Sequence, residues 1–121
     1  MKMTTSTRQV GDVTIVDING RIELGDESAA LRNLILDLLR QGHIKILLNL
    51  GAVHYIDSTG LGALVSTFTS VKKQQGQLKL LNLTDKVDDV MQLTKLYTIF
   101  DTFSDESEAV KSFGHSTSAS A

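Results

Sequence analysis

Two neighbouring stretches decide the fold: the apolar run Ile44-Lys45-Ile46-Leu47-Leu48-Asn49-Leu50 and the octapeptide Asp57-Ser58-Thr59-Gly60-Leu61-Gly62-Ala63-Leu64. The first is short and dense in apolar residues, which is typical of a strand buried on both faces of a sheet. The second opens a helical pattern with an apolar stripe that continues to Val71. A strand, a turn and a helix are therefore predicted, with Ser58 near the helix start, where backbone N–H groups lack helical partners.

Further strands are expected on both sides of this unit. The first two should form a hairpin, because Gly11-Asp12 between them is a tight-turn pair. Asn19-Gly20 marks a turn after the second strand. In chain order the expected strands are 4–10, 13–18, 44–50, 77–83 and 97–100.

About four helices are expected, because apolar residues recur at three- and four-residue spacing between the strands. The residues expected to cap or end them are Asp26 and Gly42 for the first, Gly76 for the end of the second, Thr84 for the start of the third, and Ser104 for the start of the fourth, which spans 105–113. Strands that alternate with helices imply crossover connections. The predicted fold class is α/β, a mixed sheet with a leading antiparallel hairpin followed by parallel strands.

The composition predicts one globular domain and argues against several kinds of partner. With 121 residues, 41% of them hydrophobic, the chain can build one core, expected within 1–113, followed by a small polar tail at 114–121 that is expected to be disordered. A net charge of −2 with scattered Lys and Arg argues against nucleic acid and an anionic membrane. The absence of cysteine excludes disulfides, and the absence of an apolar leader or membrane span predicts a cytoplasmic protein.

The sequence allows two roles for Ser58. Its hydroxyl could cap the helix by accepting from the N–H of Gly60 or Leu61, worth about 1 kcal/mol. It could also carry a phosphate, because free N–H donors and the helix dipole both favour negative charge there. Gly60 and Gly62 each cost a helix roughly 0.5–1 kcal/mol, which suggests that a partner needs close access to this turn. Asp57 is either a second capping carboxylate or part of the acceptor loop.

Other chemistries fit the residues poorly. A serine nucleophile at a hydrolase elbow needs a glycine where Ile56 stands, and its base would have to be His54, expected in the loop before Ser58. The dinucleotide fingerprint fails because Val65 replaces its third glycine. The four residues Asp57, Asp85, Asp88 and Asp89 lack the spacing of a metal loop. No cofactor, metal or catalytic residue is therefore expected.

The order strand, turn, Asp57-Ser58-Thr59-Gly60-Leu61-Gly62, helix resembles the anti-sigma factor antagonists of bacteria, the phosphorylatable members of the STAS domain family. The segments Gly20-Arg21-Ile22, Leu48-Asn49-Leu50-Gly51-Ala52-Val53 and Leu78-Lys79-Leu80-Leu81-Asn82-Leu83 fit the same pattern, so the resemblance covers about 10–113. It implies a partner switch that regulates sigma-factor-dependent transcription in a stress response. The unphosphorylated antagonist binds an anti-sigma factor that is a serine/threonine kinase, a histidine-kinase-like ATPase, and so frees the sigma factor.

The resemblance also implies roles for individual residues. Ser58 would be the phosphorylated residue, with Thr59 as the second choice, and a serine phosphatase would restore it. The residues implied to bind the partner are Asp57, Ser58, Thr59, Gly60, Leu61, Gly62 and Glu23. The chain itself would catalyse nothing, and it would be a monomer or weak dimer.

Two departures from the family pattern bear on partner affinity. Many relatives carry an aspartate where this chain has Asn49, so a negative charge expected near the loop is missing. Relatives also often carry an aspartate where this chain reads Glu23-Leu24-Gly25. The alternative is a non-switching STAS scaffold in a stress-signalling or transporter complex, in which Ser58 is only a cap.

Overall fold

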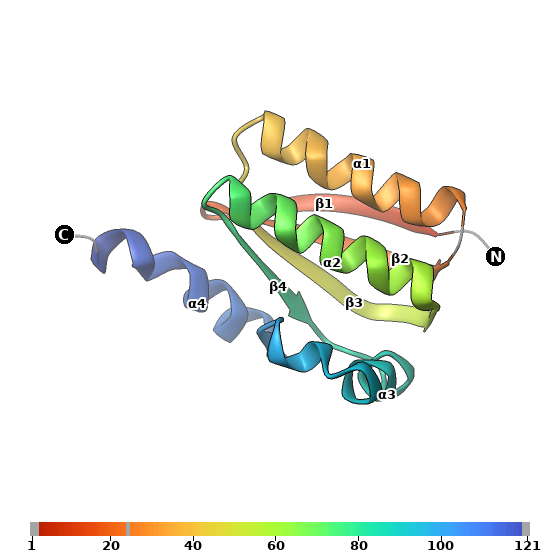
Figure 1. The fold of residues 1–121 in the computed structure, drawn as a ribbon. Helices are drawn as coiled ribbons and strands as arrows, with labels where there is room; N and C mark the ends of the chain where they lie inside the picture. The colour runs from red at the N-terminus through yellow and green to blue at the C-terminus, as the bar shows by residue number, and fades with distance from the viewer. Residues whose placement is uncertain (1–2, 24, 120–121) are drawn as a thin grey trace.

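A mixed five-stranded sheet forms the centre of the computed structural model, which describes residues 3–23 and 25–119 (Figure 1). The sheet order follows the chain: β1 (Thr4–Val10), β2 (Val13–Ile22), β3 (Lys45–Ile56), β4 (Gln77–Leu81) and β5 (Thr102–Phe103). β1 pairs antiparallel with β2, and the remaining neighbours pair parallel. The predicted fold class is confirmed.

Helices cover both faces of the sheet unequally. The elements are α1 (Asp26–Arg40), α2 (Ser58–Lys73), α3 (Asp85–Thr94), the short 3-10 helix η1 (Leu96–Thr98) and α4 (Glu106–Ala119). The larger apolar core holds side chains of α1, α2 and α3 against one face, and α1 and α2 lie side by side there (Figure 1). On the other face α4 contributes Ala109 and Phe113 to a smaller core with Val13, Ile15 and Leu47.

Both central strands run further than their local sequence indicates. β2 continues through Asn19-Gly20 to Ile22, so the predicted turn at this dipeptide is wrong. Register shifts with β3 on both sides of these residues bend the strand without ending it. β3 likewise continues past Leu50 to Ile56, which pairs with Ile22. The extension brings the ends of β2 and β3 to the start of α2.

The strand predicted at 97–100 is wrong. Its first two residues, Tyr97 and Thr98, belong to η1, and the last strand is β5, which has only two residues. Phe100 is buried and its ring meets Phe68 of α2 edge-on at 5.1 Å between centroids, while Tyr97 and Ile99 stay exposed. The apolar residues that suggested a strand at 97–100 therefore belong to a helical turn followed by one buried aromatic, Phe100. β4 also ends at Leu81 instead of Leu83, because Asn82 adopts a positive φ of 58°.

Of the N-caps predicted for α1, α3 and α4, two are wrong and one is confirmed. α1 has Gly25 at its N-cap, which offers no side-chain acceptor, and Asp26 is its first residue. In α4 the carboxylate of Asp105 accepts from the N–H of Glu108 at 2.9 Å, in the role expected of Ser104. The Thr84 hydroxyl does accept from an N–H in the first turn of α3, at 3.5 Å.

The end of the chain differs from expectation in one respect. α4 continues to Ala119, past the predicted end at Phe113. The domain bounds of 1–113 and the disorder expected of 114–121 stay predictions, and residues 120–121 lie outside the described residues.

Candidate functional site

The start of α2 is fixed to the ends of two parallel strands. β3 ends at Ile56 and α2 begins at Ser58, with Asp57 between them. The N–H of Asp57 donates to the carbonyl of Ile22, at the end of β2, at 3.3 Å. The carbonyl of Asp57 accepts the first helical hydrogen bond from Leu61 at 2.9 Å. The predicted order of strand, turn and helix is confirmed, and the motif lies at the carboxyl ends of β2 and β3.

Asp57 caps α2, and Ser58 does not. The Asp57 carboxylate accepts from the N–H of Gly60 at 2.8 Å, so the interpretation of Asp57 as a capping carboxylate is confirmed and the interpretation of the Ser58 hydroxyl as a cap is wrong. Ser58 is the first residue inside the helix, and both Ser58 and Thr59 are exposed, whereas Asp57 is half-buried. Because a carboxylate already serves the helix start, the exposed serine is available for another role.

Substitutions at the two positions should separate these roles. Replacing Asp57 by alanine is expected to lower the free energy of unfolding by about 1 kcal/mol, because it removes the cap. Asp57→Asn should retain most of that stability, since an amide oxygen also accepts. Ser58→Ala should stay within about 0.5 kcal/mol of wild type, as exposed substitutions do. Urea unfolding measures all three, and an equal loss in Ser58→Ala and Asp57→Ala would show that the hydroxyl caps the helix.

The two glycines of the first turn have different reasons to be glycine. A Cβ on Gly60 would lie 2.2 Å from the carbonyl oxygen of Ile22, so this glycine allows α2 to approach the end of β2. A Cβ on Gly62 would meet nothing within 4 Å, and the residue is exposed. Gly60 therefore serves packing, and at Gly62 the expected close access of a partner stays a prediction.

Glu23 lies at the same edge of the sheet and is held by Arg21. The Nε of Arg21 donates to Glu23 Oε2 at 2.7 Å, and this carboxylate raises the pKa of Arg21. The Arg21 guanidinium also stacks on the ring of Tyr55 at 4.2 Å from its centroid. Arg21 and Tyr55 are register partners on β2 and β3, two and three residues before Glu23 and Ser58 respectively.

We call the group Arg21, Glu23, Tyr55, Ser58 and Thr59 the acceptor corner. Sequence reasoning missed Tyr55 and gave Arg21 no role, because their contact depends on the parallel register of β2 and β3. Among the residues implied to bind a partner, Gly60 and Leu61 are buried, so they lie on the side of α2 that packs against the core. The accessible part of the corner combines hydroxyls, an ion pair and a half-exposed tyrosine.

Catalytic and metal chemistry find little support at this corner. His54 lies on β3 instead of the loop where it was expected, and no hydrogen bond joins it to Ser58 in the described residues. No cluster of three or more histidine or acidic side chains suited to a metal ion occurs among residues 3–23 and 25–113. The absence of a catalytic residue therefore stays a prediction.

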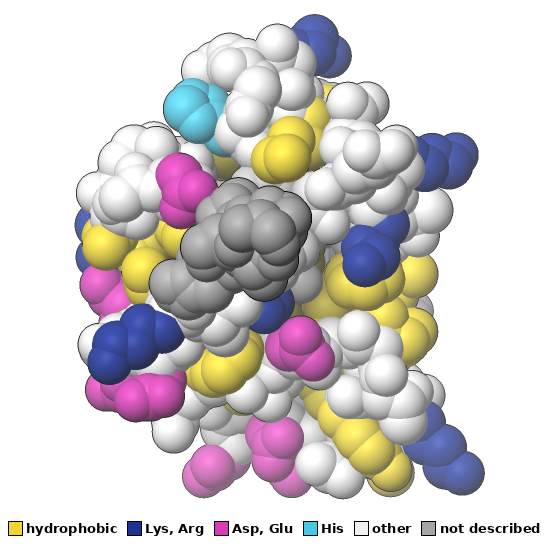
Figure 2. Space-filling model, turned by 90° about the vertical axis from the view of Figure 1, so that its left-hand side faces the viewer, with side chains coloured by type: hydrophobic (Ala, Val, Ile, Leu, Met, Phe, Trp, Pro, Cys, Tyr) yellow, Lys and Arg dark blue, Asp and Glu magenta, His cyan; other side chains and the backbone are white. Residues whose placement is uncertain are grey.

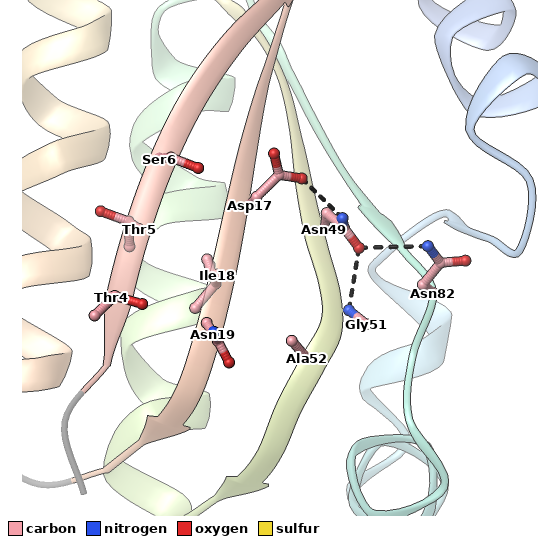
Figure 3. Close-up of a pocket in the computed structure, with 10 residues that line it drawn as sticks. All are labelled: Thr4, Thr5, Ser6, Asp17, Ile18, Asn19, Asn49, Gly51, Ala52 and Asn82. Carbon is pink, nitrogen blue, oxygen red and sulfur yellow. Dashed lines mark hydrogen bonds between the residues drawn. The ribbon is translucent and has the colours of Figure 1, made fainter.

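A polar pocket of about 390 Å³ opens on the sheet face that carries α4 (Figure 3). Its lining includes Thr4 and Ser6 on β1, Asp17 and Asn19 on β2, Asn49 on β3, and Asn82 after β4. Arg8 donates to both carboxylate oxygens of Asp17, at 2.7 and 3.1 Å, and so lowers the pKa of Asp17. The pocket is therefore lined by hydroxyls, amides and one carboxylate whose charge is already matched.

Asn49 belongs to this pocket and not to the loop near Ser58. Its amide donates to Asp17 at 2.8 Å, and its oxygen accepts from the N–H of Gly51 at 3.1 Å (Figure 3). The strand rise places Asn49 roughly 25 Å along β3 from Asp57. An aspartate at this position would face Asp17, so the departure from the family pattern affects the sheet face and leaves the charge near Ser58 unchanged.

The surface at the opposite end of the sheet carries mixed charge. Figure 2 shows Lys, Arg, Asp and Glu interspersed among the described side chains there, without a block of either sign. The absence of nucleic acid among the partners stays a prediction from the sequence. In the part of the chain that the structure describes, every helix falls short of the length and apolar character that crossing a bilayer demands.

The fold and the corner define a small α/β domain that presents an exposed serine at the start of a helix. Residues 4–109 match the STAS domain family, and the chain belongs to that family. It is 37% identical over 101 residues to the anti-sigma-B factor antagonist of Bacillus subtilis, a match that covers 84% of this chain and 91% of the relative.

Two solved structures share the fold at lower sequence identity. The Bacillus cell fate determinant SpoIIAA in its phosphorylated form superposes with a TM-score of 0.70 at 20% identity, covering 89% of this chain and 97% of that one. A sulfate transporter family protein of Wolinella succinogenes superposes with a TM-score of 0.72 at 22% identity, covering 83% of each chain. The fold therefore occurs in proteins of more than one function.

Proposed function

We propose that this chain is an anti-sigma factor antagonist whose partner binding is switched off by phosphorylation of Ser58. In its unmodified form it binds an anti-sigma factor that is also a serine/threonine kinase with a histidine-kinase-like ATPase fold. Binding frees a sigma factor and so regulates transcription in the cytoplasm. A serine phosphatase reverses the modification.

The observation that carries the proposal is the exposure of Ser58 beside a helix start that another residue caps. A serine required for capping would lose its role on modification, whereas Asp57 keeps α2 in place. The relationship to the Bacillus subtilis antagonist supports the same role. Thr59 is also exposed and is the second candidate for the acceptor.

The chemical step belongs to the kinase. The Ser58 oxygen forms a bond to the γ-phosphorus of ATP, the bond from that phosphorus to the bridging oxygen breaks, and ADP leaves. The serine proton passes to a base of the kinase. The product carries about −1.5 to −2 charges at pH 7.

The domain should remain folded when Ser58 is modified. The first N–H groups of a helix have no intrahelical acceptor. In α2 the N–H of Gly60 donates to the Asp57 carboxylate. The N–H groups of Ser58 and Thr59 remain near the phosphate, and the helix dipole favours its charge. The N–H donors and the helix dipole offset the repulsion between the phosphate and Asp57. We therefore expect phosphorylation to change partner binding and to leave the fold intact.

The acceptor corner supplies the features expected of a docking surface around this serine. Tyr55 is 38% exposed and its ring stacks on Arg21, and aromatic and arginine side chains are the usual anchors of interfaces. Phosphate on Ser58 would place negative charge and bulk among these groups. The partner would then face an added charge that it cannot pair.

The test is an intact-mass measurement after incubation with candidate kinases and ATP. We expect a mass gain of one phosphate in wild type and none in Ser58→Ala. If Ser58→Ala still gains the mass of a phosphate and Thr59→Ala does not, the phosphorylated residue is Thr59 and the proposed switching mechanism is unchanged. Binding to the kinase that is identical with and without phosphate would favour the non-switching scaffold, a role that the transporter-family neighbour makes a real alternative.

A further inference from the structure

We propose that the open edge of β1 pairs with β1 of a second copy of this chain, in antiparallel register about a two-fold axis at Thr7. β1 is the first strand of the sheet and all seven of its residues are exposed. Among the described residues its backbone hydrogen bonds go to β2. Its outer side is therefore available to another strand.

β1 lacks most of the devices that usually protect an edge strand. Protein edges are blunted by charged side chains, proline, bulges or shortness. The sequence Thr4-Thr5-Ser6-Thr7-Arg8-Gln9-Val10 has neither proline nor lysine, and its register with β2 is unbroken. Its one charged side chain, Arg8, points along the sheet face to Asp17 and Glu106, with N–O distances of 2.7 and 2.8 Å.

The hairpin geometry determines which backbone groups face outward. Val10 and Val13 close the two-residue turn, so this pair exchanges hydrogen bonds across the hairpin. Hydrogen-bonded pairs alternate along an antiparallel ladder. The outward N–H and C=O groups are therefore those of Thr5, Thr7 and Gln9.

These three positions are self-complementary. With the axis at Thr7, Thr7 faces its own copy and Thr5 faces Gln9 of the second copy. Arg8 falls opposite Ser6, so no like charges meet across the seam, and its charge is already matched by two carboxylates. Threonine pairs are favourable across strands. A second copy thus fits the edge without any change in the chain.

The other edge of the sheet explains why pairing should stop at two copies. β5 has two residues, too few to offer a matching ladder to β1. Head-to-tail growth through β1 and β5 is therefore unfavourable, and the two-fold contact closes on itself. Ser58 lies on α2 and takes no part in this seam, so the pairing is independent of the proposed function.

The test combines oligomeric state with a site-specific cross-link. By sedimentation velocity the full chain should sediment as a concentration-dependent dimer, Thr7→Val should retain it, and Thr7→Lys should weaken self-association at least tenfold. Circular dichroism verifies that each variant is folded. A wild type that stays monomeric at millimolar concentration would overturn the proposal.

The register is tested with single cysteines, because the chain has none of its own. Thr7→Cys places two thiols on directly opposed residues about 5.5 Å apart between Cα atoms, within disulfide reach. Gln9→Cys is the matched control on the same face, with its copies roughly 14 Å apart along the strands. Oxidation should yield a covalent dimer from Thr7→Cys and not from Gln9→Cys, and the reverse result would reject the register.

Discussion

Replacing Ser58 by aspartate is expected to weaken binding to the partner kinase by at least ~2 kcal/mol, about 30-fold in Kd. Ser58 is exposed at the start of α2, three residues after Tyr55 in the chain, and we expect a partner that docks on the acceptor corner to cover it. A charge covered without a counter-charge costs several kcal/mol, and the neighbouring Asp57 adds repulsion. Isothermal titration calorimetry with the unphosphorylated kinase measures the change.

Two controls isolate the charge at Ser58. Ser58→Asn adds similar bulk without charge and should bind within about threefold of wild type. Thr69→Asp adds the same charge at an exposed position later in α2 and should leave binding unchanged. Equal affinity of Ser58→Asp and wild type would exclude Ser58 from the interface, and an equal loss in Ser58→Asn would assign the effect to size.

The sequence was sufficient to place the motif because its signals are local. The apolar run that begins at Ile44 forms the first half of β3, and the stripe from Leu61 to Val71 lies wholly within α2, so each signal marks one element. The parallel order of the strands followed from their alternation with helices. These features depend on hydrophobic periodicity within about twenty consecutive residues, so they can be recognised without knowing which segments pair in the sheet.

The choice between Asp57 and Ser58 as the cap could not be made locally. Both residue types cap helices, and the outcome depends on where β3 ends. β3 runs to Ile56 because this residue pairs with Ile22 on β2, a contact between segments far apart in the chain. That pairing sets Asp57 at the N-cap and leaves Ser58 exposed.

The same limit applies to the rest of the corner. Glu23 was implicated from the family pattern, but its ion pair with Arg21 and the stacking of Arg21 on Tyr55 depend on register. The turn predicted at Asn19-Gly20 failed for a related reason, since pairing with β3 carries β2 through a dipeptide that would end an isolated strand. Sheet register decided each of these cases.

Gly60→Ala is expected to lower the free energy of unfolding by at least ~2 kcal/mol, while Gly62→Ala raises it by about 0.5–1 kcal/mol. Both changes add one methyl group to the first turn of α2. At Gly60 the new Cβ would lie 2.2 Å from the Ile22 carbonyl oxygen and 2.9 Å from a side-chain carbon of Ile56. At Gly62 it would meet nothing within 4 Å, so only the gain in helix propensity remains.

The Gly60 contact also links stability to the proposed switch. The carbonyl of Ile22 that approaches Gly60 is the one that accepts from the N–H of Asp57, so an added methyl must push α2 away from the anchor of its own cap. Gly60→Ala should therefore slow phosphorylation of Ser58 in the folded fraction, whereas Gly62→Ala should not unless the kinase contacts that position. Urea unfolding together with phosphorylation rates at low temperature measures both effects. Stability changes of the same sign at the two glycines would contradict the close approach of α2 to β2 on which the geometry of the corner depends.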